Sequence, residues 1–393
     1  MSSGISTTRR DFLKGSAGAL MIGFSLPLGP RVLAAAADRF APNAYLRITP
    51  DGQVTVLCGL SEMGQGVHTG IAMLIAEELD ADWTAVRLEQ APVDPAYVNP
   101  LLGMQGTGGS TAIRGHWEPM RRAGAAAREM LVSAAAANWG VDAAQCRTEG
   151  GRVLHPDGRS IAYGELVTSA AELPLPQQPR LKDPREFRIL GRELPRLDTP
   201  SKVDGRAGFG LDVKLPGLLT AVMAHAPVPG AKPLSVDDRK AKAIPGVRRV
   251  ITSPQGVAVL AEGYWAALQG RDALAVEWDL GKHADLSSAA VSRALGEAVA
   301  RPATAARSDG DMDIQVARKL EAVYEVPYLA HACMEPMNCT VAIADGHCTL
   351  WVGSQAPEGA RATAARVSGL PIDQVTVNVL QLGGGFGRRA GQD

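Results

Sequence analysis

The glycines near the carboxyl end of the chain could hold an anionic ligand. Residues 383–389 read Gly-Gly-Gly-Phe-Gly-Arg-Arg and follow a strand-like run. Glycine lacks a Cβ atom, so such a bend can take positive φ angles and bring its N–H groups close to an anion. Arg388 and Arg389 add fixed charge suited to phosphate. We therefore predict a backbone cradle with Phe386 as an apolar wall; the simpler alternative is a strand-to-helix turn.

Two further glycine loops lie in the first third of the chain, at residues 62–70 (EMGQGVHTG) and 103–111 (GMQGTGGST). The order strand, first loop, helix, strand and Glu89 is that of a dinucleotide site, and a tight turn before a helix is the alternative. Gln65 stands between two glycines, where it would crowd a pyrophosphate. In the second loop, hydroxyls and free N–H groups could hold phosphate oxygens, and a plain surface loop fits equally well.

Two polar residues stand in or next to apolar runs. Gln355 directly precedes a predicted helix, where a glutamine is most often an exposed neighbour of the cap. Glu335 lies in the run HACMEP at residues 331–336. It is either a buried, paired carboxylate or a pocket residue, and the run itself favours neither.

The amino terminus predicts export. Arg9 and Arg10 form a twin-arginine motif, an apolar stretch follows at residues 15–28, and small residues at 34–37 suit cleavage. The apolar stretch is shorter than a membrane-spanning helix requires. We therefore interpret residues 1–37 as a signal peptide of the twin-arginine route, which exports folded proteins, and expect a periplasmic protein.

Composition excludes several classes of protein. The 393 residues include 40 basic and 41 acidic ones, so we expect no nucleic-acid or membrane-surface binding. After the signal peptide no run is apolar enough to cross a bilayer. The five cysteines and seven histidines lack the spacing of zinc or iron–sulfur sites, so we expect no protein ligand to a metal. A disulfide between Cys333 and Cys339 stays open.

Strands and helices must position these loops, and the fold class we expect is mixed α/β. One helix, at residues 117–139, should have Pro119 in its first turn and Gly140 at its end. Residues 319–326 alternate apolar and polar side chains, which predicts a half-buried strand. Further strands are expected at residues 44–48, 53–60, 85–89, 220–225, 257–261, 274–278, 338–344, 349–353 and 375–382, and further helices at 71–79, 286–300 and 358–368.

Taken together, the motifs resemble the molybdopterin-binding large subunits of the xanthine dehydrogenase and aldehyde oxidase family. Within it they are most similar to the exported branch typified by the isoquinoline 1-oxidoreductase beta subunit. Several segments match in order, which is far more specific than any one glycine pattern. The matching segments are residues 62–66, 105–110, 202–207, 327–336, 355 and 383–389.

The resemblance implies a domain order. Portions of a molybdopterin-binding domain, at residues 38–172 and 319–393, would flank an α/β hammerhead-like domain at 201–282. A proline-rich linker at 173–200 and a connector at 283–318 would join them.

The resemblance also implies a cofactor, molybdopterin cytosine dinucleotide with molybdenum. The pterin dithiolene would hold the metal, so no Cys or His ligand is needed. Gln355 would hydrogen-bond an oxygen on the metal. The cofactor-binding positions carried over are Gln65, Gly66, Gly108, Gly109, Ser110, Gly384, Gly385, Phe386, Gly387 and Arg388.

The implied reaction is hydroxylation of an aldehyde or an N-heteroaromatic compound, with water as the oxygen source. Electrons would pass to 2Fe-2S clusters on a separate small subunit. The family's general base is a glutamate near the carboxyl end of a longer subunit, and no residue here matches it. We therefore expect an amino-terminal half that is inactive alone. The alternatives are an exported NAD(P)-type Rossmann dehydrogenase and a non-enzymatic binding module.

Overall fold

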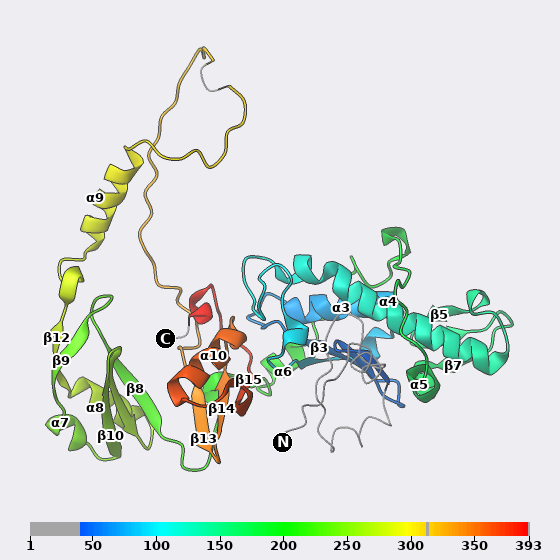
Figure 1. Ribbon diagram of the computed structural model, residues 1–393, viewed down its shortest axis with the longest axis horizontal. Helices are drawn as coiled ribbons and strands as arrows, with labels where there is room; N and C mark the ends of the chain where they lie inside the picture. The colour runs from blue at the N-terminus through cyan, green and yellow to red at the C-terminus, as the bar shows by residue number, and fades with distance from the viewer. Residues whose placement is uncertain (1–39, 312–313, 392–393) are drawn as a thin grey trace, which may run out of the picture. The chain divides into compact units, whose positions relative to one another are not determined.

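The computed structural model describes residues 40–311 and 314–391, and the chain falls into two units (Figure 1). One unit runs up to Val213 and resumes at His331; the other is Lys214–Ala330. The predicted signal peptide lies outside the described residues. The two predicted portions of a molybdopterin-binding domain therefore belong mostly to one unit, and most of the predicted hammerhead-like domain belongs to the other.

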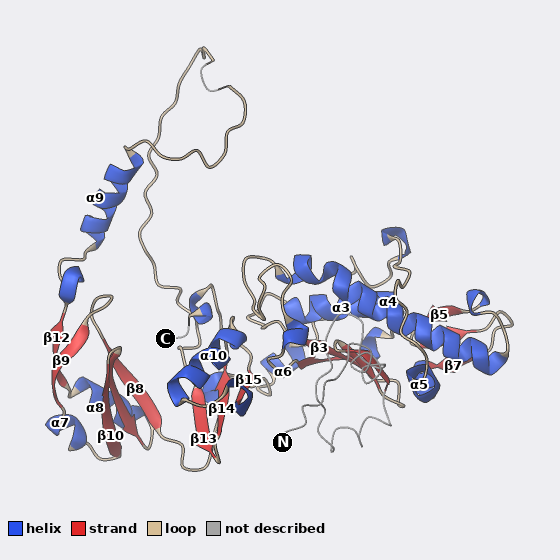
Figure 2. Ribbon diagram, viewed as in Figure 1, coloured by secondary structure: helices blue, strands red, loops and turns tan. Residues whose placement is uncertain are grey.

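The first unit begins with a four-stranded sheet in the order β1-β2-β3-β4. Strands β1, β2 and β3 are antiparallel neighbours, whereas β3 and β4 are parallel and are joined through α3. Helix α4 packs along α3, and α5 packs on α4 (Figure 2). The bounds are β1 Phe40–Asn43, β2 Leu46–Ile48, β3 Val54–Cys58, α3 Val67–Leu79, β4 Val86–Gln90, α4 Ala112–Trp139 and α5 Tyr163–Ala171.

Close helix packing explains the small residues of α4. A Cβ atom on Gly124 would lie 2.5 Å from the carbonyl oxygen of Ile75, so only glycine allows the two helices this approach. The core between α3, α4 and the sheet is fully buried at Leu74, Leu79 and Leu131. Packing of this apolar surface is what stabilises the unit.

The predicted start of α4 was wrong. The helix begins at Ala112, directly after the second glycine loop, so Pro119 lies inside it and not in its first turn. Proline at the first turn is the commoner arrangement, which is why the sequence pattern misled. In the interior, Pro119 lacks the N–H that would bond the carbonyl of Gly115. Gly140 ends the helix with φ 67°, as predicted.

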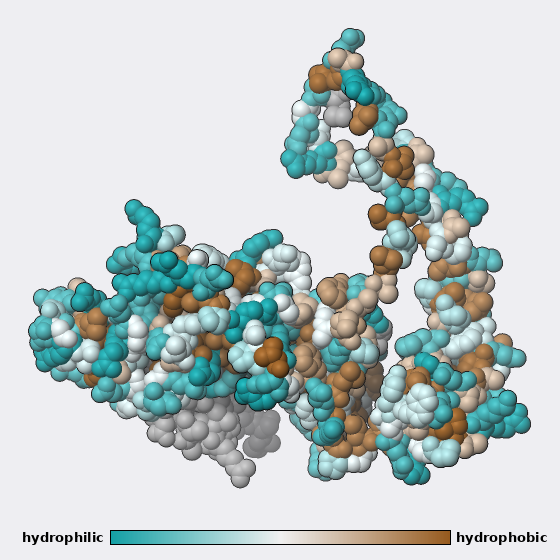
Figure 3. All heavy atoms as spheres, turned by 180° about the vertical axis from the view of Figure 1, so that it is seen from behind, coloured by the Kyte–Doolittle hydropathy of each residue, from teal (hydrophilic) through white to brown (hydrophobic). Residues whose placement is uncertain are grey.

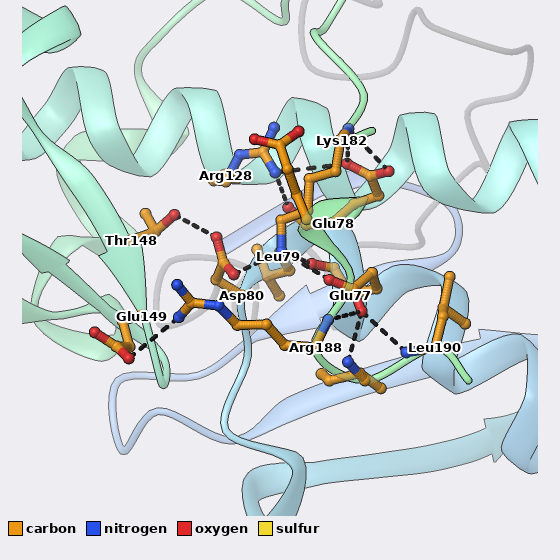
Figure 4. Close-up of polar contacts among 12 residues, drawn as sticks. Glu77, Glu78, Leu79, Asp80, Arg128, Thr148, Glu149, Lys182, Arg188 and Leu190 are labelled. Carbon is orange, nitrogen blue, oxygen red and sulfur yellow. Dashed lines mark hydrogen bonds and ion pairs between the residues drawn. The ribbon is translucent and has the colours of Figure 1, made fainter. Parts of the chain in front are cut away.

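The proline-rich segment after α5 is tied to α3 and α4 by charged side chains (Figure 4). Glu77 is fully buried; it accepts hydrogen bonds from the N–H groups of Arg188, Ile189 and Leu190 at 2.9, 2.6 and 2.9 Å. The ammonium of Lys182 lies 2.9 Å from the same carboxylate. The segment therefore runs over the surface as predicted but is held at fixed points. A small sheet of β5 (Arg147–Glu149), β6 (Arg152–Leu154) and β7 (Ser160–Ala162) lies beside α4.

The carboxyl-terminal part of the first unit is a three-stranded sheet in the order β13-β14-β15. Strands β14 and β15 are parallel and are joined through α10, which packs on them. A bridge between Phe209 and Gln381 ties the end of the linker region to this part. The predicted strands and helix are confirmed here. The bounds are β13 Thr340–Ala344, β14 His347–Val352, α10 Pro357–Ser368 and β15 Val375–Val379.

The second unit contains two small antiparallel sheets, β10-β11-β8 and β12-β9. Helix α8 packs on β8 and β11, and α9 follows β12. The predicted elements at 220–225, 257–261, 274–278 and 286–300 are confirmed. The bounds are β8 Thr220–His225, β9 Lys232–Asp237, α7 Arg239–Lys242, β10 Val247–Ser253, β11 Gly256–Ala261, α8 Tyr264–Asp272, β12 Ala275–Asp279 and α9 Ser288–Val299.

The strand predicted at residues 319–326 was wrong. These residues form neither helix nor strand, and Leu320, Tyr324 and Val326 are more than four-fifths exposed. A strand needs a hydrogen-bonded neighbour, and none of the strands described here pairs with this segment. In the part of the chain that the structure describes, no helix is both long and apolar enough to cross a membrane.

Candidate functional site

The first glycine loop, between β3 and α3, is organised by Glu62. Its carboxylate accepts hydrogen bonds from the N–H groups of Gly64 (2.9 Å), Gly66 (3.0 Å) and His68 (3.0 Å). The side chain is fully buried and lies 3.1 Å from the guanidinium of Arg196. An anion at a helix N-terminus is favourable, and here a side chain supplies it. The N-terminus of α3 is therefore already occupied by the protein itself, which the sequence analysis did not foresee.

The two predicted site residues of this loop shape the loop. Gln65 folds back, so that its Oε1 accepts from the N–H of Met63 at 2.7 Å and its Nε2 donates to the carbonyl of Ser61 at 3.0 Å. Gly66 is the N-cap of α3 and takes φ 83°, which glycine adopts without strain. Their role as cofactor contacts stays a prediction.

The second glycine loop precedes α4 and keeps free donors. Thr107 and Thr111 use their hydroxyls within the protein: Thr107 Oγ1 accepts from the N–H of Ser61 at 2.8 Å, and Thr111 Oγ1 donates to the carbonyl of Gly108 at 2.7 Å. Ser110 is exposed with φ 53°, and no described residue bonds its hydroxyl. No side chain caps the first N–H groups of α4. Helix N-termini of this kind bind anions.

The third loop is the predicted cradle, residues 383–387. Positive φ angles occur at Gly384 (105°), Phe386 (51°) and Gly387 (93°). A Cβ atom on Gly385 would lie 2.2 Å from the sulfur of Met63 and 2.8 Å from Oε1 of Gln355, so no other residue fits. Among the described residues, none accepts a hydrogen bond from the N–H groups of Gly384, Gly385 or Phe386. The ring of Phe386 is 70% exposed.

Gln355 joins the second and third loops. It is buried, not exposed as its position before a helix suggested. Its Nε2 donates to the carbonyl of Thr107 at 3.0 Å, and its Oε1 accepts from the N–H of Gly387 at 3.0 Å. Its backbone carbonyl accepts from the N–H of Thr107 at 2.8 Å. The first loop joins them through the N–H of Leu382, which donates to the carbonyl of Glu62 at 3.1 Å. Three loops far apart in sequence therefore meet.

The prediction that both arginines point toward phosphate was wrong for Arg389. Its side chain is buried and lies 2.9 Å from the carboxylate of Glu335. It also donates to the carbonyls of Gly384 at 2.9 Å and Gly353 at 3.2 Å. Glu335, for its part, accepts from the N–H of Gly383 at 2.9 Å. This resolves the open alternative for Glu335 as a buried, paired carboxylate, and the pair fixes both ends of the bend. Arg388 is not buried in this way.

The described residues hold no cluster of three or more His, Cys, Asp or Glu side chains that could bind a metal. All five cysteines, Cys333 and Cys339 included, are free thiols. A polar cavity of about 270 Å³ lies elsewhere in the first unit, between α3, α4, β5 and the proline-rich segment. The basic residues Lys182 and Arg188 in its wall are already paired with carboxylates, so it is not our candidate site.

The residues of the three loops fit a phosphate-bearing cofactor. The bend at Gly385 has no room for a Cβ atom, and its neighbours Gly384 and Phe386 present free N–H groups. Ser110 and the uncapped start of α4 add donors in the second loop. Backbone donors of this kind favour an anion, and the exposed ring of Phe386 favours a flat apolar group beside it.

Comparison with known proteins agrees with this chemistry. A family model described as a molybdopterin cofactor-binding domain matches residues 7–201, and a second model with the same description matches residues 295–392. Both ranges contain glycine loops of the site. The chain therefore belongs to the molybdopterin-binding subunits of the xanthine dehydrogenase and aldehyde oxidase family.

Three curated relatives are similar over most of the chain. The beta chain of the isoquinoline 1-oxidoreductase of Brevundimonas diminuta is 35% identical over 89% of this chain and 51% of its own length. The membrane-bound aldehyde dehydrogenase (pyrroloquinoline-quinone) of Gluconacetobacter polyoxogenes is 33% identical over 99% of this chain and 53% of its own. A nicotinate dehydrogenase chain of Pseudomonas putida is 28% identical over 89% of this chain and 30% of its own. The chain thus spans about half the length, or less, of these relatives.

Among solved structures, the Cu,Mo-CO dehydrogenase in its carbon monoxide reduced state is similar over 51% of this chain and 32% of its own, with 19% identity. The TM-score is 0.35, which is too low to compare the arrangement of elements.

Proposed function

We propose that this chain is the cofactor-binding part of an exported molybdenum hydroxylase that oxidises aldehydes or N-heteroaromatic compounds. The observation that carries the proposal is the meeting of three glycine loops around Gln355, with free backbone donors on two of them. The matching domain models name the cofactor, and the relatives' names supply the two substrate classes.

The chain's own residues would hold the cofactor in two places. The N–H groups of Gly384, Gly385 and Phe386 would donate to it where Gly385 leaves room for close approach, and the ring of Phe386 would wall one side. Ser110 and the start of α4 would hold phosphate, in keeping with the cytosine dinucleotide form of the cofactor. When bound, the cofactor supplies a molybdenum centre that takes two electrons from the substrate carbon as oxygen from water is added.

We further propose that a small subunit with 2Fe-2S clusters takes up the electrons and that the complex works in the periplasm. The supporting features are the twin-arginine motif at Arg9 and Arg10 and the absence of any cluster-type cysteine spacing in the sequence. Since no residue matches the family's general base, residues 1–393 alone should not turn over substrate.

The test is chemical analysis of the chain purified together with the subunits it assembles with. Molybdenum is measured by elemental analysis, and the nucleotide is identified after acid release. We expect molybdenum and cytidine monophosphate. Bound NAD(P) without metal would support the dehydrogenase alternative, and a quinone without molybdenum would match the name of the second relative. Absence of every cofactor would leave the binding-module alternative and refute the proposal.

The variant Gly385→Ala sharpens this test, because its Cβ atom would occupy the tightest point of the cradle. Gly208→Ala is the matched control: it lies in the same unit but outside the three loops, and a Cβ atom there would meet nothing within 4 Å. We expect molybdenum content to fall at least tenfold in the first variant and to stay within twofold in the second. Equal content in both would contradict the assignment of the cradle.

A further inference from the structure

The apolar face of the β13-β14-β15 sheet extends beyond the helix that covers it. In the ladder, Val341 stands opposite Leu350 and Ile343 opposite Cys348. Opposed residues of neighbouring strands lie on the same face of a sheet. Leu350 and Cys348 are buried, with Val375 and Val377 of β15 continuing the same face. Val341 and Ile343 therefore belong by register to the core face.

These two side chains lack cover. Val341 is 49% exposed and Ile343 is 62% exposed, whereas Leu350 and Cys348 opposite them are 5% and 1% exposed. The cause is the position of α10, which packs on β15 and, less extensively, on β14. Figure 3 shows hydrophobic side chains at the surface over these elements. A β-branched residue on a core face gains free energy only when it is buried, so the face is incomplete.

The outer edge of β13 is open as well. Its sheet partner is β14, and no strand among the described residues pairs with its other side. An edge of this kind presents unpaired N–H and C=O groups to any neighbouring strand. Protective features of natural edges, such as charged side chains or proline, are missing from β13, which reads Thr-Val-Ala-Ile-Ala. Edge and face are therefore suited to the same partner.

The region matched by the second domain model has other unburied apolar side chains. Residues 319–329 lie within the matched range 295–392, and Leu320, Val323 and Tyr324 are 83%, 96% and 91% exposed. A domain whose apolar residues stay exposed in two places buries too little surface to be complete. What is missing should belong to the same domain.

We propose that β13 and the helix-side face around Val341 and Ile343 bind polypeptide that corresponds to the remaining half of the longer relatives. The occupant would add a strand to the free edge of β13 and cover the two side chains beside α10. The relatives support this choice of occupant, because this chain spans 51% and 53% of two of them. The inference goes beyond the cofactor chemistry, since it concerns how the domain is completed.

The test uses this chain and a separate polypeptide comprising the second half of the Brevundimonas diminuta relative, produced together and purified as a complex. Hydrogen exchange of the amides in residues 340–344 is measured with and without the second polypeptide. We expect at least tenfold slower exchange in the complex. Failure to form a complex, or unchanged exchange at 340–344 within a complex, would overturn the proposal.

Three variants complete the test. Val341→Asp and Ile343→Asp should each weaken the complex at least tenfold, while Val367→Asp should leave it unchanged, because Val367 is 74% exposed on α10 and away from this face. Circular dichroism of each variant alone checks folding; if one fails to fold, the exchange measurement on the unchanged chain still decides. A homodimer of the chain that Val341→Asp dissolves would assign the face to a second copy and overturn the proposed occupant.

Discussion

Glu77 provides the sharpest test of how the proline-rich segment is held. Its carboxylate accepts three backbone N–H groups, from residues 188–190, and pairs with Lys182 (Figure 4). Burial alone raises the pKa of Glu77, but the hydrogen bonds from Leu190, Lys182 and Ile189 outweigh it, and the pKa lies below its ordinary value. The protein therefore holds Glu77 as an anion at neutral pH.

The variant Glu77→Gln keeps the shape and removes the charge. A hydrogen bond to a charged group contributes about 1.5–3 kcal/mol and a neutral one about 0.5–1.5 kcal/mol, so three weakened bonds cost roughly 3 kcal/mol. Lys182 keeps Asp80 at 2.6 Å, which spares most of the further loss of an unpaired buried charge. A loss of about 3 kcal/mol corresponds to roughly 100-fold faster opening of the segment.

The assay is native-state hydrogen exchange at the amides of residues 188–190, which bond Glu77 directly. The matched control is Glu149→Gln, which removes the exposed partner of Arg188 in the same region. Exposed pairs contribute at most about 1 kcal/mol, so this variant should change exchange less than tenfold. Exchange in Glu77→Gln within threefold of that in Glu149→Gln would refute the reasoning.

The same carboxylate predicts a pH dependence. Because the pKa of Glu77 is lower in the folded chain than in the unfolded one, its stabilisation is present above about pH 4.3 and is lost as the pH falls through the folded value. Exchange at residues 188–190, corrected for the intrinsic effect of pH, should therefore rise below about pH 4.3. In Glu77→Gln this rise should be absent.

The remaining predictions concern the site. Gly385→Ala should lower cofactor content without unfolding the first unit, measured by molybdenum analysis beside circular dichroism, with Gly208→Ala as control; an unchanged content would contradict the tight cradle. Arg389→Ala should destabilise the unit by about 3–5 kcal/mol in urea unfolding, because it leaves Glu335 buried without its partner; a loss below about 1 kcal/mol would count against the buried pair. Burial lowers the pKa of His68, so stability should fall as the pH drops below about 6.5, and His68→Gln should flatten that slope in thermal unfolding; an unchanged slope would show that another group titrates.

Local sequence patterns predicted most of the elements. The helix at α10 and the strands at β4, β8 and β14 came out within about two residues, because apolar periodicity and turn residues are local signals. They failed where the signal depends on neighbours. Residues 319–326 alternate like a strand, yet no described strand pairs with them. Pro119 suited a first turn, yet α4 begins at the loop before it.

The glycine motifs by themselves determined that this chain has three flexible bends, and their order determined the family resemblance that the domain models confirmed. Only the tertiary structure decided what each bend does. Glu62 fills the first with its own carboxylate, Arg389 turns inward to Glu335, and Gln355 joins the second bend to the third. The physical reason is that hydrogen-bond donors in a bend carry no mark in the sequence of whether a distant side chain will satisfy them. That is fixed only when burial brings residues far apart in the chain within about 3 Å of one another.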